Sequence, residues 1–167
     1  MSKNICIIPG AFDPVTNGHF DFILRASKLF DIVYVTAFDN SAKKTMFTLE
    51  ERREMLSLAC EGIENVRVDA TNQLLVGYAE LKGADYIVKG VRNSKDFEYE
   101  NDMSMINRAI SDNKIETLFL PAKTENLYIS STFVREMIAY KRDISNYVPA
   151  KVNGFINGLM EGRMRGR

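Results

Sequence analysis

The chain has a single histidine, His19, and it follows a short apolar run that stops at Pro9 and Gly10. Turn-forming residues separate the run from His19, and a helical pattern of apolar residues begins at Phe20. This order predicts a buried strand, a loop and the start of a helix. Such a junction directs backbone N–H groups and the positive end of a helix dipole at whatever lies above the strand, which favours a phosphate.

Cations and helix-capping residues follow other strand-like runs of the sequence. Since ligands of an open parallel sheet bind beyond the carboxyl ends of its strands, we expect these groups to gather at one edge. Together they describe a polyphosphate site. After the second run come Lys43 and Lys44, after the fourth Lys89, Gly90, Val91 and Arg92, and after the fifth Ser130, Ser131 and Thr132, with Arg135 one turn later.

Each of these features also has an ordinary structural explanation. A lone histidine at a helix start often caps or packs, and paired lysines often lie in a solvated loop. The serines and threonine could serve only as N-caps, and Arg92 only as an exposed ion-pair partner. Their convergence on one sheet edge favours the binding site.

Short apolar runs bounded by turn residues recur along the whole chain, at residues 4–8, 32–37, 66–69, 86–89 and 117–120. Helical patterns separate them, which predicts right-handed crossovers. The predicted fold is therefore α/β, a Rossmann-like, doubly wound, five-stranded parallel sheet with helices on both faces. No linker or repeat interrupts it, so we expect a single domain over residues 1–167.

The helix boundaries carry several local signals. Thr48 and Glu51 fit a capping box at the start of the second helix, and Gly83 fits a left-handed cap at the end of the third. Asp96 is the expected N-cap of the fourth helix. Tyr99, Met103, Ile106 and Ile110 share one face of that helix, which we expect to be buried. The basic residues 162–167 predict a frayed, solvated end.

Composition limits the function classes. Lys+Arg and Asp+Glu both number 22, so the net charge is zero, which argues against a general nucleic-acid or membrane binder. No apolar run approaches the ~18 residues of a membrane span, and no signal peptide is recognisable. Cys6 and Cys60 lack metal or redox spacing, so we expect buried free thiols and a cytoplasmic protein.

Several kinds of chemistry lack their motifs in this sequence. It contains no Gly-x4-Gly-Lys-Ser/Thr phosphate loop, no Gly-x-Gly-x-x-Gly, no nucleophile elbow and no His/carboxylate cluster. We therefore expect neither a protein-bound metal nor a covalent intermediate. Phosphoryl-type transfer fits, because there the protein mainly positions groups and neutralises charge.

Residues 16–19 (Thr-Asn-Gly-His) and 129–135 (Ile-Ser-Ser-Thr-Phe-Val-Arg) resemble the paired signatures of the nucleotidylyltransferase superfamily. Longer segments at 9–19, 43–52 and 90–100 are similar to the phosphopantetheine adenylyltransferases within it. The resemblance implies transfer of an adenylyl group from ATP, with Mg²⁺, to 4′-phosphopantetheine, giving dephospho-coenzyme A and pyrophosphate. It also implies a homohexamer.

The resemblance implies a role for individual residues as well. His19 would stabilise charge developing at the α-phosphate, Lys43 would hold the attacking phosphate, and Arg92 would hold the phosphates of ATP. The implied ATP-binding residues are Phe12, His19, Gly90, Val91, Arg92, Glu100, Asn126, Leu127, Tyr128, Ile129, Ser130, Ser131 and Thr132. The implied acceptor-binding residues are Lys43, Leu75 and Lys89.

Two positions depart from the family pattern, which usually has Ser or Thr at position 11 and Arg at position 89. Ala11 offers only its backbone N–H, and Lys89 keeps the charge without the bidentate fork of arginine. Two alternative functions remain at this point. One is nucleotidyl transfer to another phosphorylated acceptor, and the other is a catalytically silent nucleotide-binding module.

Overall fold

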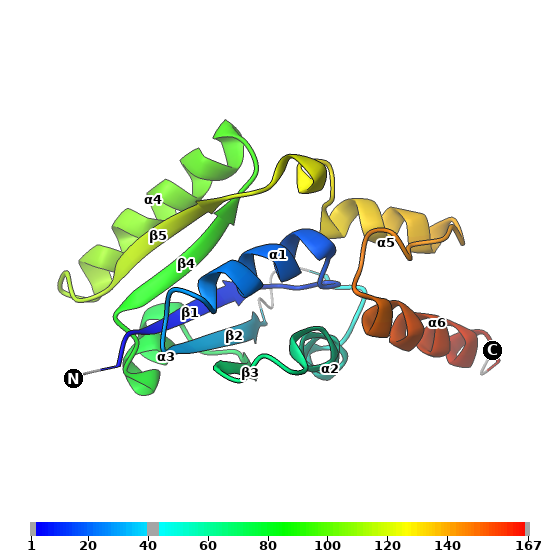
Figure 1. Ribbon diagram of the computed structural model, residues 1–167, viewed down its shortest axis with the longest axis horizontal. Coiled ribbons are helices and arrows are strands. Elements are labelled where there is room, and N and C mark those ends of the chain that lie inside the picture. Colours follow the sequence, from blue (N-terminus) through cyan, green and yellow to red (C-terminus); the bar gives the residue numbers. More distant parts are fainter. Residues whose placement is uncertain (1–2, 40–43, 166–167) are drawn as a thin grey trace.

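A five-stranded parallel sheet with helices on both faces forms the centre of the molecule (Figure 1). The computed structural model describes residues 3–39 and 44–165. The strands are β1 (Ile5–Gly10), β2 (Ile32–Phe38), β3 (Val66–Thr71), β4 (Tyr86–Val91) and β5 (Glu116–Pro121). Their order is β3-β2-β1-β4-β5, and every neighbouring pair is parallel. The predicted Rossmann-like fold is confirmed, with its switch point between β1 and β4.

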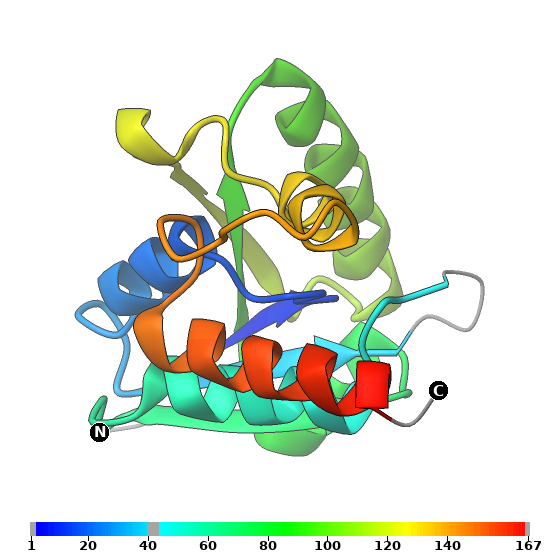
Figure 2. The same cartoon turned by 90° about the vertical axis from the view of Figure 1, so that its right-hand side faces the viewer.

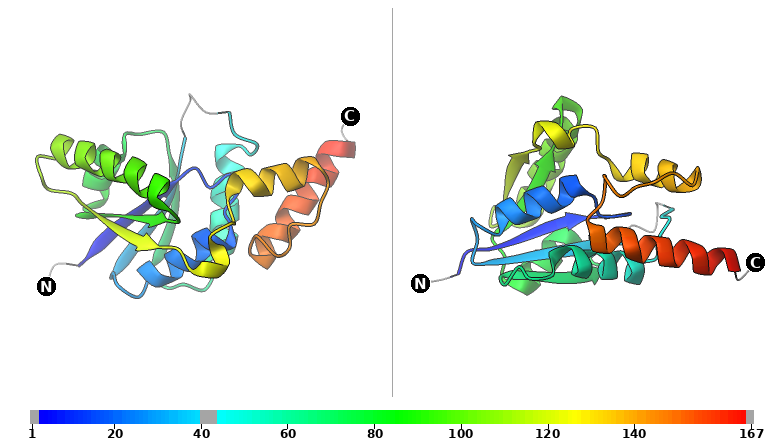
Figure 3. Two further views of the ribbon diagram at one scale, coloured as in Figure 1. Left: turned by 90° about the horizontal axis from the view of Figure 1, so that it is seen from above. Right: turned by 45° about the vertical axis from the view of Figure 1, so that its right-hand side comes forward.

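The helices follow the strands in alternation, and two more come after β5. They are α1 (Asn17–Ala26), α2 (Leu49–Cys60), α3 (Leu75–Lys82), α4 (Ser94–Ile110), the 3₁₀ turn η1 (Thr124–Asn126), α5 (Ser131–Ala139) and α6 (Ala150–Arg165). Helices α5 and α6 lie beyond the carboxyl ends of the strands (Figure 3). Seen from that end, α6 runs across the front of α2 (Figure 2).

Two hydrophobic clusters fill the two faces of the sheet. Because successive side chains of a strand point to opposite faces, neighbours in β1 join different clusters. Cys6 and Ile8 pack with the residues of α1, α2 and α6, whereas Ile7 packs with Ile87 and the residues of α3. Ile7, Ile8 and Ile87 are fully buried. The sheet is thus covered by packed side chains on both faces.

The local signals at α2 and α3 are confirmed. The Thr48 hydroxyl accepts the Glu51 N–H at 3.2 Å, and the Glu51 carboxylate accepts the Thr48 N–H at 2.8 Å. Gly83 ends α3 with φ of 65°, a conformation that glycine adopts without a steric penalty. Cys6 and Cys60 are buried free thiols, as expected.

Helix α4 differs from the prediction in two respects. Asn93, not Asp96, is its N-cap, because the Asn93 side chain accepts the Asp96 N–H at 3.0 Å. The apolar face is also not buried, since Ile106 and Ile110 are 49% and 51% exposed. The buried residue of this helix is instead the polar Asn107.

The predicted frayed C-terminal end is wrong for residues 162–165. Helix α6 continues to Arg165, and Arg163 donates to both Glu51 carboxylate oxygens at 2.7 Å. Its guanidinium also lies 5.6 Å from the centre of the Phe47 ring. The last turn of α6 is therefore held against the start of α2. Among the described helices, none is both long and apolar enough to cross a membrane.

Candidate active site

A cleft of about 420 Å³ opens at the carboxyl edge of the sheet, beside the switch point. Its walls come from the start of α1, the end of β4, the first turns of α4, η1 and the start of α5. The lining residues are Thr16, Gly18, His19, Phe22, Gly90, Arg92, Lys95, Asp96, Tyr99, Glu100, Leu120, Ala122, Asn126, Ile129, Ser130, Ser131 and Thr132. Segments far apart in sequence thus converge where a parallel sheet is expected to bind a ligand.

Hydrogen bonding fixes the tautomer of His19. The Thr16 backbone N–H donates to Nδ1 of His19 at 3.0 Å, and the Thr16 hydroxyl lies 3.0 Å from the same nitrogen. The Thr16 hydroxyl also accepts the His19 backbone N–H, so the two residues form a capping box at the start of α1. Since Nδ1 is the acceptor, the neutral ring carries its proton on Nε2 and can donate it to a ligand.

The surroundings of His19 keep the ring neutral. Its centroid lies 5.1 Å from that of Phe12 and 6.0 Å from that of Phe22, both in edge-on geometry. Burial, and then the positive charge of Arg92, lower the pKa of His19 to about 4. The free protein therefore presents a neutral hydrogen-bond donor at physiological pH rather than a cation.

Two cationic side chains, Arg92 in the cleft and Lys89 beside it, are each paired with a carboxylate of α4. Arg92 donates from Nε to Asp96 at 2.8 Å and from a second nitrogen at 3.3 Å, a bidentate pair. Lys89 lies 3.0 Å from Glu100. These pairs orient the cations before a ligand arrives.

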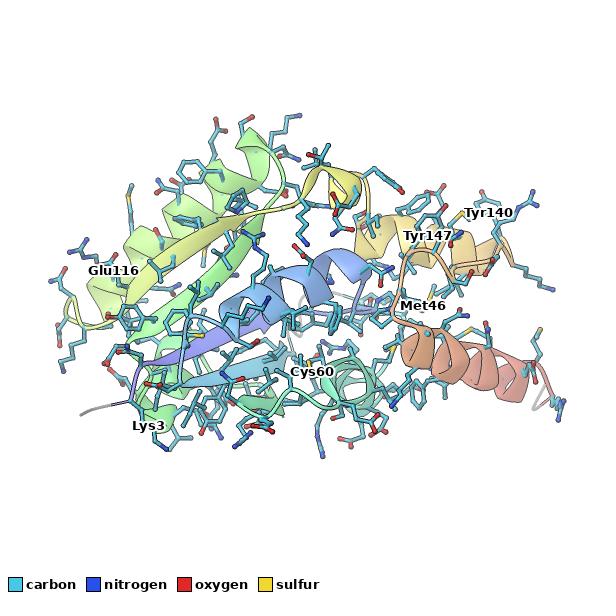
Figure 4. The ribbon with its side chains drawn as sticks, viewed as in Figure 1. Lys3, Met46, Cys60, Glu116, Tyr140 and Tyr147 are labelled. Atoms are coloured by element: carbon cyan, nitrogen blue, oxygen red, sulfur yellow. The ribbon has the colours of Figure 1, made fainter. Side chains whose placement is uncertain are left out.

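The start of α5 closes the other side of the cleft. Ser130 caps the helix by accepting the Phe133 N–H at 3.1 Å, and the Ser131 hydroxyl donates to the Pro14 carbonyl at 2.8 Å. The first N–H groups of a helix lack partners within it, so this end carries partial positive charge and suits a phosphate. Tyr147, labelled in Figure 4, packs edge-on against Phe133 at 4.9 Å and supports the helix from outside the cleft.

The ring of Phe22 lies so close to Gly90 that only glycine fits at this position. A Cβ added there would come within 2.9 Å of the Phe22 ring, which lines the same cleft. Any larger residue would push Phe22 and narrow the space beside His19. The glycine therefore keeps the floor of the cleft open.

The structure brings most of the predicted ATP-binding residues to the cleft. His19, Gly90, Arg92, Glu100, Asn126, Ile129, Ser130, Ser131 and Thr132 all line it.

The remaining predicted residues lie elsewhere. Phe12 is buried in the core against His19, and Leu127 and Tyr128 are 44% and 66% exposed. Val91 is half-buried at the end of β4. Leu75 packs against the cluster on the α3 face. Lys89 is half-buried and paired with Glu100, and Lys43 lies outside the described residues.

Several lining residues were not predicted as site residues, among them Phe22 and Lys95, and the role of Thr16 as the partner of His19 was not predicted either. Thr16 and His19 stand three residues apart, which is the spacing of a capping box with histidine in the position usually held by Glu or Gln. Lys95 lies in the first turn of α4, whereas Arg92 precedes the N-cap of that helix, so no helical spacing links the two. Only the spacing of Thr16 and His19 was readable. The contact of Phe22 with the Gly90 position is a tertiary feature without a sequence signal.

Within residues 3–39 and 44–165, no three His, Cys, Asp or Glu side chains gather to hold a metal ion. The donors of the cleft are N–H groups, hydroxyls and cations, which suit anionic oxygens.

Comparison with known proteins identifies the family. The family model described as cytidylyltransferase-like matches residues 7–137. A phosphopantetheine adenylyltransferase of Nautilia profundicola is 43% identical over 87% of this chain and 94% of its own length. The chain belongs to the phosphopantetheine adenylyltransferase family. A second relative of that name, from Vesicomyosocius okutanii, is 45% identical to this family member over 90% of the chain and 94% of its own length.

Solved structures support the fold of this phosphopantetheine adenylyltransferase family member. A putative nicotinate-nucleotide adenylyltransferase from Vibrio parahaemolyticus has a TM-score of 0.70 at 22% identity, over 94% of this chain and 93% of its own. The nicotinic acid mononucleotide adenylyltransferase of Plasmodium falciparum, complexed with NaAD, has a TM-score of 0.70 at 17% identity, over 95% and 96%. At these identities the likeness concerns the fold alone.

Proposed function

We propose that the cleft catalyses transfer of the adenylyl group of ATP to 4′-phosphopantetheine, giving dephospho-coenzyme A and pyrophosphate. The observation that carries the proposal is the convergence of His19, Arg92 and the start of α5 on one cleft in a chain of this family. In this reaction an oxygen of the acceptor phosphate forms a bond to the α-phosphorus. The bond from that phosphorus to the β-phosphate bridging oxygen breaks, and pyrophosphate leaves.

The nucleophile needs no general base. A phosphate monoester has a second pKa of ~6 and is largely a dianion at neutral pH. Rate acceleration then comes from in-line positioning and from stabilising the charge that develops on the α-phosphate. The Nε2–H of His19 supplies a neutral donor for that charge, since Nδ1 is already occupied by Thr16.

We assign the triphosphate to the cationic and helix-start groups. Arg92, the backbone at Gly90, and the start of α5 at Ser130–Thr132 would hold it. Mg²⁺ would enter with ATP as part of the substrate. Glu100, Asn126 and Ile129, which line the cleft, would hold the nucleoside.

An assay of the purified protein tests the proposal directly. MgATP and 4′-phosphopantetheine are mixed with the protein, and dephospho-coenzyme A and pyrophosphate are measured. Nicotinate mononucleotide and glycerol phosphate serve as alternative acceptors. Product only with another acceptor, or ATP binding without turnover on any of them, would contradict the proposal.

Ala11 and Lys89, the two positions that depart from the family pattern, can be tested by restoring the residues that the family usually has. We expect the combined change Ala11→Thr and Lys89→Arg to lower the KM for the acceptor about tenfold. A hydroxyl and a guanidinium fork would each add a charge-assisted hydrogen bond to the phosphate, worth about 1.5–3 kcal/mol before competing costs. Steady-state kinetics with the acceptor varied would measure this, and an unchanged acceptor KM would count against it.

We also propose a homohexamer and a cytoplasmic location. The exposed apolar face of α4, with Tyr99 59%, Ile106 49% and Ile110 51% exposed, supports association of copies.

Ile106→Glu is therefore expected to shift the assembly toward smaller species, because it places a charge in an apolar contact. Analytical ultracentrifugation of both proteins at equal concentration measures the effect. Leu29→Glu is the matched control, since Leu29 is a 62% exposed apolar residue that is not on α4. A monomeric wild-type protein would remove the proposal of a hexamer.

A further inference from the structure

The loop that follows β1 is tied by long-range contacts to the segment that follows β2. Residues 40–43 of that second segment lie outside the described part of the chain, but the stems on either side, 38–39 and 44–47, lie within it. Each stem is bonded to the β1 loop through a different charged side chain. These two side chains, Arg52 and Asp13, do not line the cleft.

Arg52 binds the first stem. It projects from α2 and is 1% exposed, among the most buried large side chains of the molecule. One guanidinium nitrogen donates to the Phe38 carbonyl at 3.0 Å and to the Ala11 carbonyl at 2.8 Å, and the other donates to Asp39 at 3.0 Å. A buried cation is stabilised only by such partners, so losing one of these contacts would leave the buried charge uncompensated.

Asp13 binds the second stem. It is 4% exposed, and its two carboxylate oxygens accept the backbone N–H groups of Met46 and Phe47, both at 3.0 Å. Met46 is labelled in Figure 4. Arg135 of α5 completes the arrangement, donating to the Asp13 carbonyl at 2.7 Å with its guanidinium 3.5 Å from the carboxylate. The second stem, the β1 loop and α5 therefore meet at one carboxylate.

The same β1 loop leads directly to His19. Thr16, which fixes the ring of His19, is three residues after Asp13, and Pro14 between them accepts the Ser131 hydroxyl. A shift of either stem would thus be transmitted to the loop that orients His19. Lys44 lies on the second stem, beside the position at which the proposed acceptor cation Lys43 stands in the sequence.

We propose that Arg52 and Asp13 are positioning residues that fasten both stems of the segment after β2 to the β1 loop. They thereby keep the residues proposed to bind the acceptor at a fixed distance from His19. The assignment of the acceptor side rests on the proposed function. Neither residue touches the reacting atoms. Their effect is to fix the separation between the acceptor phosphate and the α-phosphate.

The main test is Asp13→Asn, which keeps the volume but can accept only one of the two N–H groups properly. We expect the acceptor KM to rise about tenfold or more, while the ATP KM changes less than about threefold, because a displaced second stem would weaken the groups proposed to hold the acceptor and leave those proposed for the triphosphate in place. Asp69→Asn is the matched control. Asp69 also accepts several bonds, from Tyr78, Lys82 and Ala70, but on β3 away from the cleft. Equal changes in both KM values, or an equal effect of Asp69→Asn, would overturn the inference.

Arg52 provides an independent arm. Arg52→Ala leaves a space the size of the side chain and is expected to raise the acceptor KM. Added guanidinium ion should then lower that KM toward the wild-type value, whereas an equal concentration of NaCl should not. Arg52→Lys serves if the alanine variant does not fold, and we expect it to retain the raised acceptor KM because lysine cannot bond all three partners. Full activity of Arg52→Lys would contradict the assigned role.

A readout without substrates separates this inference from the proposed function. Amide exchange of Met46 and Phe47 is expected to accelerate in Asp13→Asn, while exchange at Phe133, protected by Ser130, stays unchanged. If the wild-type protein fails to use the acceptor, the proposed function is wrong, and exchange still decides whether Asp13 holds the second stem. Unchanged exchange at both amides would overturn the inference.

Discussion

Replacing His19 with alanine is expected to lower kcat/KM for adenylyl transfer by about 10²- to 10³-fold, the usual effect of removing one well-placed donor from a site that stabilises developing charge. The protein should remain folded, because the ring is half-buried at a helix start rather than in the core. Steady-state kinetics and circular dichroism would measure the two quantities. His19→Gln, which keeps an N–H donor, should lose less activity than His19→Ala, and equal losses would argue against a donor role.

Because the pKa of His19 is low in the folded protein, this residue is expected to make the free energy of unfolding decrease as the pH falls. The folded-state pKa of about 4 lies below the ordinary value of 6.5, so the unfolded chain binds more protons between these values. The neutral ring therefore contributes fully to the free energy of unfolding above pH 6.5, and this contribution is lost as the pH falls toward 4. The free energy of unfolding of His19→Ala should therefore fall less than that of the wild type over this window. Equal slopes of unfolding free energy against pH would contradict the low pKa.

Replacing Arg92 with alanine is expected to raise the KM for ATP roughly 10- to 100-fold. Charge-assisted hydrogen bonds are worth about 1.5–3 kcal/mol, and the loss also leaves the Asp96 carboxylate unpaired beside the proposed triphosphate site. ATP binding measured by calorimetry would test this alongside kinetics.

Two further variants separate the loss of the Arg92 hydrogen bonds from the effect of the unpaired Asp96 carboxylate. Adding Asp96→Ala to Arg92→Ala should recover part of the ATP affinity, because it removes the unpaired negative charge. Arg108→Ala is the control, since Arg108 pairs with Glu116, and neither residue lines the cleft. An ATP KM within twofold of the wild type in Arg92→Ala would remove Arg92 from the proposed site.

Features specified by nearby residues were predictable from the sequence. The five strands, the Thr48 capping box and the Gly83 cap depend on local patterns, and the structure confirms them. The gathering of His19 and Arg92 was also predictable, because parallel strands end at a common edge.

Contacts between distant segments were not predictable in the same way. The Asp13 bonds span 33 and 34 residues, and the Arg163 bonds to Glu51 span 112. Nothing in the flanking sequence indicates them. Helix α4 was misjudged because periodicity shows which residues share a face, not whether that face packs inside the chain.

Helix α4 carries two sets of side chains that meet in its first turns. Asp96, Tyr99 and Glu100 line the cleft, while Ile106 and Ile110 lie farther along the helix on its uncovered side. Tyr99 belongs to both sets, since it lines the cleft and is 59% exposed. If another copy of the chain packs on this helix, as in the proposed hexamer, one continuous helix would form both a wall of the cleft and part of the contact between subunits. A ligand that displaced Tyr99 would then also alter that contact.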